Sequence, residues 1–207
     1  YVFGALVLVF LSAFATKNQE KAIAKNVPAR EKTKLVLYGT FLGLTSSFYY
    51  LSIQYVPVSV GIILLMQTIW MGVLLEFFIA RHLIHPMKVI GAVVTLLGTA
   101  LAAKVFESEI RLDGRGVIYG LLAAASYTGV LFTTGRIALN LPLFIRSKYL
   151  VFGGLLMILL FWNVQIIEDI SWMVFLKWGS FLGFFGTLLP PILFNKGMPG
   201  IGTGMGS

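Results

Sequence analysis

The stretch "VSVGIILLMQTIWMGVLLEFFIA", residues 58–80, decides the fold class of this chain. Its only ionisable residue is Glu76. About 20 consecutive apolar residues are enough for a helix to cross the roughly 30 Å hydrocarbon core of a bilayer. The stretch therefore predicts a membrane-spanning helix. This helix should begin after the corner at Val56-Pro57, because a proline ends one helix and opens the next.

Similar apolar runs recur on both sides of this stretch. They predict seven membrane spans and no soluble domain, with the spans at 1–15, 35–55, 58–80, 87–104, 116–136, 148–164 and 176–195. The 207 residues are 58% hydrophobic and only 12% charged, whereas soluble domains carry about 25% charged residues. The composition therefore predicts an all-α, polytopic integral membrane protein.

The basic residues predict the orientation of these spans. If the 16–34 connection is cytoplasmic, the opposite side holds only four of the 16 Lys and Arg residues: Lys104, Arg111, Arg115 and Lys177. An excess of basic residues on the cytoplasmic side is the usual rule for membrane proteins. It explains the net charge of +8 without a nucleic-acid partner. We expect a multi-pass protein of the cell membrane (the inner membrane in a Gram-negative cell) with the 16–34 loop in the cytoplasm.

The sequence also contains a weak internal repeat. "YGTFLG" at 38–43 is similar to "WGSFLG" at 178–183, and both lead to a proline corner, "YVPV" at 55–58 and "GMPG" at 197–200. In the predicted topology the first segment runs outward and the second runs inward. Repeats of opposite orientation are the architecture of many secondary transporters, so the match predicts inverted repeats.

These residues resemble a known family. Residues 38–103 are similar to one EamA-type repeat of the drug/metabolite transporter superfamily, with a Gly-rich helix, the corner "YVPVSVG" and the run "HPMKVIGAVVTLLGTAL". The resemblance implies two inverted five-helix repeats, here 1–112 and 113–207, with the first and the last two of ten helices outside this sequence. Family members usually have Gly-Glu where this chain has Arg81-His82. Any role of that glutamate is therefore not carried over.

The resemblance also implies a function. It indicates a secondary transporter that exports small, amino-acid-like organic metabolites by alternating access. One alternative is a sugar-phosphate or nucleotide-sugar exchanger of the same superfamily. Such an exchanger would need basic side chains in its cavity. The predicted spans, however, place every Lys and Arg at a helix end. The other alternative is a helical membrane scaffold or subunit without transport. A polar cavity between the spans 35–55, 58–80 and 116–136 would favour transport, and a dry bundle would favour the scaffold.

Polar residues on faces of small residues are the candidates for substrate contact. Residues three, four or seven positions apart share a face of a helix. Bulky polar residues that continue such faces suggest a cavity wall. The glycines on these faces predict close helix packing; they are Gly39, Gly43, Gly116, Gly120, Gly179, Gly183 and Gly186. Gln67 lies near mid-bilayer, where an amide lines water or bonds to a neighbouring helix. The predicted substrate-binding residues are Tyr50, Gln54, Gln67, Trp70 and Tyr127.

Other chemistry has little support in the sequence. Glu76 is the acidic residue inside a span, and it would serve either in proton coupling or at the cytoplasmic interface. The chain has no Cys, and His82 and His85 have no third ligand nearby, so we expect no metal site. We also expect no cofactor and no enzymatic activity. The predicted partners are the lipid bilayer and a small-molecule substrate, and the sequence does not indicate an oligomeric state.

Overall fold

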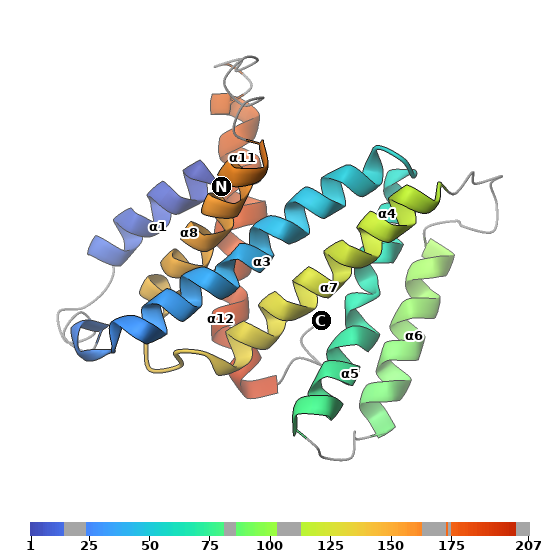
Figure 1. The fold of residues 1–207 in the computed structure, drawn as a ribbon, viewed down its shortest axis with the longest axis horizontal. Helices are drawn as coiled ribbons and strands as arrows, with labels where there is room; N and C mark the ends of the chain where they lie inside the picture. The colour runs from blue at the N-terminus through green and yellow to red at the C-terminus, as the bar shows by residue number, and fades with distance from the viewer. Residues whose placement is uncertain (15–23, 81–85, 103–112, 163–172, 174, 202–207) are drawn as a thin grey trace. The chain divides into compact units, whose positions relative to one another are not determined.

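The computed structural model describes residues 1–14, 24–80, 86–102, 113–162, 173 and 175–201. All secondary structure in these residues is helical, and a helix occupies part of each predicted span (Figure 1). The elements are α1 (Val2–Phe14), α3 (Ala29–Ile53), α4 (Val58–Met66), α5 (Thr68–Ala80), α6 (Pro86–Ala102), α7 (Gly114–Arg136), α8 (Leu143–Trp162), the π-helix η1 (Phe175–Gly179), α11 (Ser180–Leu182), the π-helix η2 (Gly183–Leu188) and α12 (Leu189–Ile201).

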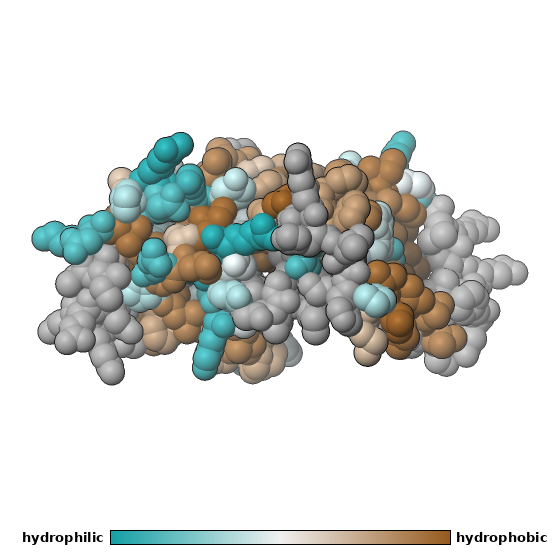
Figure 2. All heavy atoms as spheres, turned by 90° about the horizontal axis from the view of Figure 1, so that it is seen from below, coloured by the Kyte–Doolittle hydropathy of each residue, from teal (hydrophilic) through white to brown (hydrophobic). Residues whose placement is uncertain are grey.

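Three helical segments are long and apolar enough to cross a membrane, namely Val58–Ile79, Gly114–Arg136 and Leu143–Trp162. Large apolar side chains are exposed on the helices, for example Phe14 at 76% and Leu101 at 69%. Figure 2 shows such hydrophobic side chains at the surface across the face that it draws. Exposed apolar surface of this kind marks a partner or membrane surface. The prediction of an all-helical membrane protein is confirmed, whereas seven crossings remain a prediction.

Two helices begin earlier than the sequence predicted. α3 begins at Ala29 rather than at 35, and α8 begins at Leu143 rather than at 148. Arg146 and Lys148 therefore lie inside a membrane-compatible helix. The expectation that every Lys and Arg lies at a helix end is wrong for these two residues, because the helix follows directly after Pro142.

One of the two predicted proline corners is wrong. Pro57 stands at the N-cap of α4, as expected, but α12 continues through Pro199 to its end. A proline inside a helix leaves the carbonyl four residues earlier without its N–H partner. Here that carbonyl belongs to Asn195, and it accepts a hydrogen bond from Arg146 Nη1 at 3.3 Å. The inverted-repeat prediction loses the support of this corner.

The chain forms two compact units, which are described separately. Unit 1 comprises Tyr1–Gly43 and Thr133–Gly200, and unit 2 comprises Leu44–Phe132. α3 and α7 each contribute residues to both units. This division differs from the predicted repeats, which separate at residue 112. Compact units and sequence repeats are different properties of a bundle, so the repeat boundaries remain a prediction.

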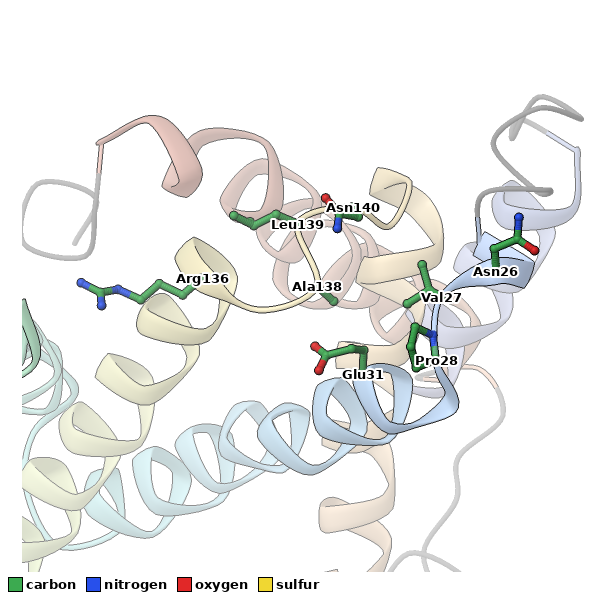
Figure 3. Close-up of a pocket in the computed structure, with 8 residues that line it drawn as sticks. All are labelled: Asn26, Val27, Pro28, Glu31, Arg136, Ala138, Leu139 and Asn140. Carbon is green, nitrogen blue, oxygen red and sulfur yellow. The ribbon is translucent and has the colours of Figure 1, made fainter.

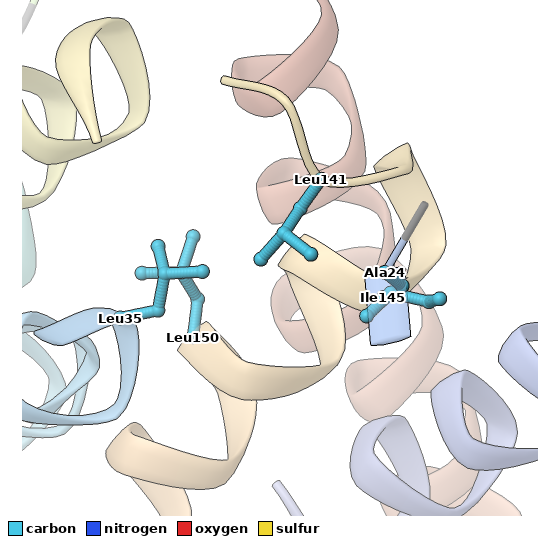
Figure 4. Close-up of a cluster of buried hydrophobic side chains, with 5 residues drawn as sticks. All are labelled: Ala24, Leu35, Leu141, Ile145 and Leu150. Carbon is cyan, nitrogen blue, oxygen red and sulfur yellow. The ribbon is translucent and has the colours of Figure 1, made fainter. Parts of the chain in front are cut away.

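Unit 1 is held together by a small apolar core and by close helix crossings. The buried core residues, drawn in Figure 4, are Ala24, Leu35, Leu141, Ile145 and Leu150. A Cβ added at Gly43 would lie 2.5 Å from the Gly154 carbonyl oxygen, and one at Gly153 would overlap the Val36 carbonyl. α3 and α8 therefore cross backbone against backbone. The prediction that the glycines of α3 serve helix packing is confirmed.

Unit 2 packs α7 against the end of α3 and against α4. A Cβ added at Gly116 would lie 2.7 Å from Val56 Cγ1, and one at Gly120 would lie 2.6 Å from Leu64 Cδ1. The glycines of α7 thus pack as predicted. α6 lies beside α5 (Figure 1). In unit 1, by contrast, a Cβ at Gly186 would meet nothing within 4 Å, so the packing role predicted for that glycine is not seen among the described residues.

Candidate functional site

The 58–80 helix has one irregular turn at Gln67, which separates α4 from α5 near the middle of the 22-residue segment Val58–Ile79 and itself keeps right-handed helical dihedral angles (φ −59°, ψ −16°). The Gln67 N–H donates to the Leu64 carbonyl, only three residues earlier, at 3.1 Å. The turn is therefore tightened, and the Ile63 carbonyl is deprived of the N–H that an α-helix would give it. Gln67 Nε2 donates to this same carbonyl at 3.1 Å. The side-chain amide thus replaces the backbone hydrogen bond that the irregular turn removes.

Trp70 completes this arrangement. Its Nε1 donates to Gln67 Oε1 at 2.7 Å, and the indole is 38% exposed. An amide nitrogen carries two hydrogens, and the described part of the chain offers no acceptor for the second one of Gln67. This Gln67–Trp70 pair therefore presents one N–H donor beside an aromatic face. A ligand with an acceptor group next to an apolar or cationic group would match it.

On the opposite face of the same span, a threonine hydroxyl group contacts α7. The side chain of Thr68 is buried, and its Oγ1 lies 2.7 Å from Thr128 Oγ1 on α7. Both hydroxyl oxygens also lie within hydrogen-bond distance of the Ala124 carbonyl, at 3.1 and 2.9 Å, so that the two hydroxyl protons serve two of these three contacts at a time. Nearby, Ser52 Oγ donates to the Gly116 carbonyl at 2.7 Å. This face packs on α7, and so the Gln67–Trp70 pair lies on the other side of the helix.

The other predicted site residues are not joined to this pair. Tyr50 is 52% exposed on α3, Gln54 is also exposed, and Tyr127 is half-buried on α7. Glu76 is half-buried on α5. Within the described part of the chain, no hydrogen bond links these four residues to the Gln67–Trp70 pair. The structure therefore brings together two of the five predicted substrate-binding residues.

Sequence reasoning missed two polar residues that matter for this site. Ser52 lies two positions after Tyr50, on the opposite side of α3, and Thr128 follows Tyr127 directly. The prediction for α3 was based on the bulky side chain of Tyr50, which lies on the other side of this helix from Ser52. Small hydroxyl residues are weak signals in a membrane helix, because they can also bond to a carbonyl in their own preceding turn.

Unit 1 contains a second polar centre, which we call the Arg146 cluster: Arg146, Ser147, Asn195 and the carbonyls of Thr133 and Thr134. Arg146 is only 3% exposed and donates to the backbone carbonyls of Thr133, Thr134 and Asn195. Asn195 Nδ2 donates to Ser147 Oγ at 2.8 Å. The cluster ties together α7, α8 and α12. The predicted topology places Arg146 on the cytoplasmic side of the membrane, and its burial within the protein leaves that assignment a prediction.

The described residues of unit 1 line at least two pockets. The larger, of about 620 Å³, is bordered by residues 26–28, Glu31, Arg136 and residues 138–140. Figure 3 shows that the Arg136 side chain extends away from the Glu31 carboxylate. The smaller pocket, of about 360 Å³, is bordered by α1, α8 and the residues around the start of α3, with Lys25, Lys32 and Lys148 in its wall. Neither contains a predicted substrate-binding residue.

Comparison with known proteins adds no relative. No protein-family model matches this chain, and no curated protein or solved structure is significantly similar to it. The resemblance to EamA-type repeats therefore remains a prediction from the sequence. His82 and His85, where the sequence predicted no metal site, lie outside the described residues.

Proposed function

We propose that this protein is a secondary transporter that moves small, amino-acid-like organic metabolites across the cell membrane by alternating access. The observation that carries the proposal is the irregular turn of the 58–80 helix at Gln67, where a side-chain amide takes the place of a backbone hydrogen-bond donor. Substrate sites of secondary transporters lie near the bilayer midplane, where membrane helices are discontinuous. Irregular backbone at membrane depth is tolerated where it is covered by protein or lines a cavity. The polar pair at this turn fits such a wall.

The chemistry of the Gln67–Trp70 pair supports the substrate class. The remaining amide N–H suits a carboxylate or carbonyl oxygen, and the indole suits an apolar side chain or an ammonium group. Export as the direction, and two inverted five-helix repeats as the architecture, follow from the resemblance to drug/metabolite transporters. Glu76, half-buried on α5, is the candidate for proton coupling.

The predicted topology gives one test. Because the chain has no native Cys, single cysteines introduced at Lys25 and Ser108 report without background. We expect an impermeant thiol reagent to label Lys25→Cys only from the cytoplasmic side and Ser108→Cys only from the other side. Labelling of both variants from the same side would contradict the topology and the inverted repeats.

Substitutions in the pair test the transport site. We expect Gln67→Ala and Trp70→Phe to raise the apparent KM for the substrate about tenfold, the effect of losing roughly 1.4 kcal/mol of binding. Efflux of a panel of labelled amino acids from proteoliposomes measures this, with rates divided by the amount of folded protein. Trp178→Phe is the matched control, because Trp178 is 63% exposed on η1 in unit 1. It should leave the KM unchanged.

One observation favours the scaffold alternative. Both hydrogen bonds of the Gln67 side chain stay within its own span, to Ile63 and to Trp70, which is what a purely structural amide would do. A structural Gln67 predicts that Gln67→Ala lowers the melting temperature and leaves the efflux rate per folded molecule unchanged. Absence of efflux for every metabolite tested with the complete protein would favour the scaffold.

A further inference from the structure

The smaller pocket of unit 1 has an unusual charge. Its wall contains three lysines, Lys25, Lys32 and Lys148, and no Asp or Glu. Among the described residues none of these three lysines forms an ion pair. Glu31, the residue directly before Lys32, pairs instead with Lys34, whose Nζ lies 2.8 Å from Glu31 Oε1. Three positive charges therefore share one concave surface with no carboxylate among its described lining residues, and the Lys148 ammonium lies 5.4 Å from the centroid of the Tyr149 ring.

The rest of the wall is mostly apolar, with Ser12 and Tyr149 as its other polar residues. Val9 and Ala13 of α1 border the pocket, as does Ile145 of α8. Val9 is itself 50% exposed, and α1 continues this apolar surface with Phe10 and Phe14, which are 60% and 76% exposed. The pocket thus joins a cationic concavity to an exposed hydrophobic helix face.

We propose that this pocket binds the phosphate headgroup of an anionic membrane lipid, with an acyl chain along α1. The sequence places Lys25 and Lys32 on the cytoplasmic side, where basic pockets between membrane helices meet anionic lipids. Ammonium groups are point charges that bind phosphate oxygens from several directions. A free phosphate ion would use the lysines alone, whereas a lipid uses the lysines and the apolar wall together. The site lies in unit 1, apart from the residues proposed for transport.

Binding of fluorescent phosphatidylglycerol to the detergent-solubilised full chain tests the proposal. Each lysine near an anionic lipid surface contributes about a fivefold gain in affinity. We therefore expect Lys25→Gln, Lys32→Gln and Lys148→Gln combined to weaken binding roughly 100-fold. The charge-conserving combination Lys25→Arg, Lys32→Arg and Lys148→Arg should retain binding, which separates loss of charge from loss of folding.

A matched control removes the same charge elsewhere. Lys34→Gln, Lys177→Gln and Lys196→Gln combined also lower the net charge by three, but none of these residues lines the pocket. This variant should bind phosphatidylglycerol nearly as well as the unmodified chain. Equal loss of affinity in both glutamine variants would mean general electrostatic attraction and would overturn the proposal.

Competition distinguishes the lipid from a free anion. Unlabelled phosphatidylglycerol should displace the fluorescent lipid, while phosphatidylcholine and inorganic phosphate should not. Displacement by inorganic phosphate as effective as by phosphatidylglycerol would show a site for a soluble anion. Displacement by phosphatidylcholine as effective as by phosphatidylglycerol would show that the apolar wall alone binds lipid. Either result would overturn the proposed headgroup site.

Discussion

Replacement of Arg146 by methionine should lower the free energy of unfolding by about 3 kcal/mol, because buried carbonyls left without a donor cost about 1–3 kcal/mol each. Arg146 donates hydrogen bonds to three backbone carbonyls, those of Thr133, Thr134 and Asn195. The carbonyl of Asn195 lacks its usual N–H donor because Pro199, four residues later, has none. The carbonyls of Thr133 and Thr134 lie in the last turn of α7, and the Thr133 carbonyl also accepts a hydrogen bond from the Ile137 N–H at 2.9 Å.

Two effects oppose each other at this residue. Burial of the guanidinium is unfavourable, and its Nε has no hydrogen-bond partner among the described residues. Methionine has an unbranched side chain without a charge. The substitution therefore removes the unfavourable burial of the guanidinium, which stabilises the folded state. It also removes the guanidinium hydrogen bonds to three buried carbonyls, however, and this loss is larger. Lysine provides one ammonium group in place of a planar fork and cannot reach all three carbonyls, so Arg146→Lys should restore only part of the stability.

Thermal unfolding in detergent measures the effect. A loss of about 3 kcal/mol corresponds to a fall in Tm of roughly 6–12 °C for a chain of this size. Arg136→Met is the matched control, since Arg136 is exposed at the end of α7, and it should change the Tm little. An unchanged Tm for Arg146→Met would show that these carbonyls find other partners and that the Arg146 cluster does not hold α7, α8 and α12 together.

The second large effect is expected at Gly153. Here α8 crosses α3 so closely that an added Cβ would overlap the Val36 carbonyl and approach Gly39 Cα to 2.9 Å. Backbone atoms cannot move aside as a flexible side chain can, so the helices must separate. Overpacking of this kind costs about 1–3 kcal/mol. Gly153→Ala should therefore destabilise the chain, and Gly153→Leu should prevent unit 1 from folding.

Gly98 on α6 is the control for this substitution. A Cβ at Gly98 would meet nothing within 4 Å, and alanine is favoured over glycine in a helix by about 1 kcal/mol. Gly98→Ala should thus leave the Tm unchanged or raise it, whereas Gly153→Ala should lower it. Equal behaviour of the two variants would mean that α3 and α8 are not in backbone contact in the folded protein.

The candidate site was predictable only in part. Gln67 and Trp70 could be chosen from the sequence, because a polar amide near the middle of an apolar run stands out and a neighbour three positions later shares its face. Tyr50 and Gln54 were chosen by the same reasoning, yet the structure leaves both exposed. A helix pattern shows which residues share a face. It does not show which face a neighbouring helix covers.

The sequence by itself determined the class of this protein and the approximate positions of its helices. A helix that crosses the bilayer needs an apolar run of a minimum length. Such a run is a local property of the sequence, so it can be found without knowledge of the tertiary structure. Only the tertiary structure decided that Arg146 is buried, that α12 continues through Pro199, and that Thr68 meets Thr128. Each of these depends on hydrogen bonds between residues far apart in the chain, such as Arg146 to Asn195 or Thr68 to Thr128. A buried polar group needs a hydrogen-bond partner. The packing of the helices decides which residue becomes that partner, and the local sequence pattern does not show it.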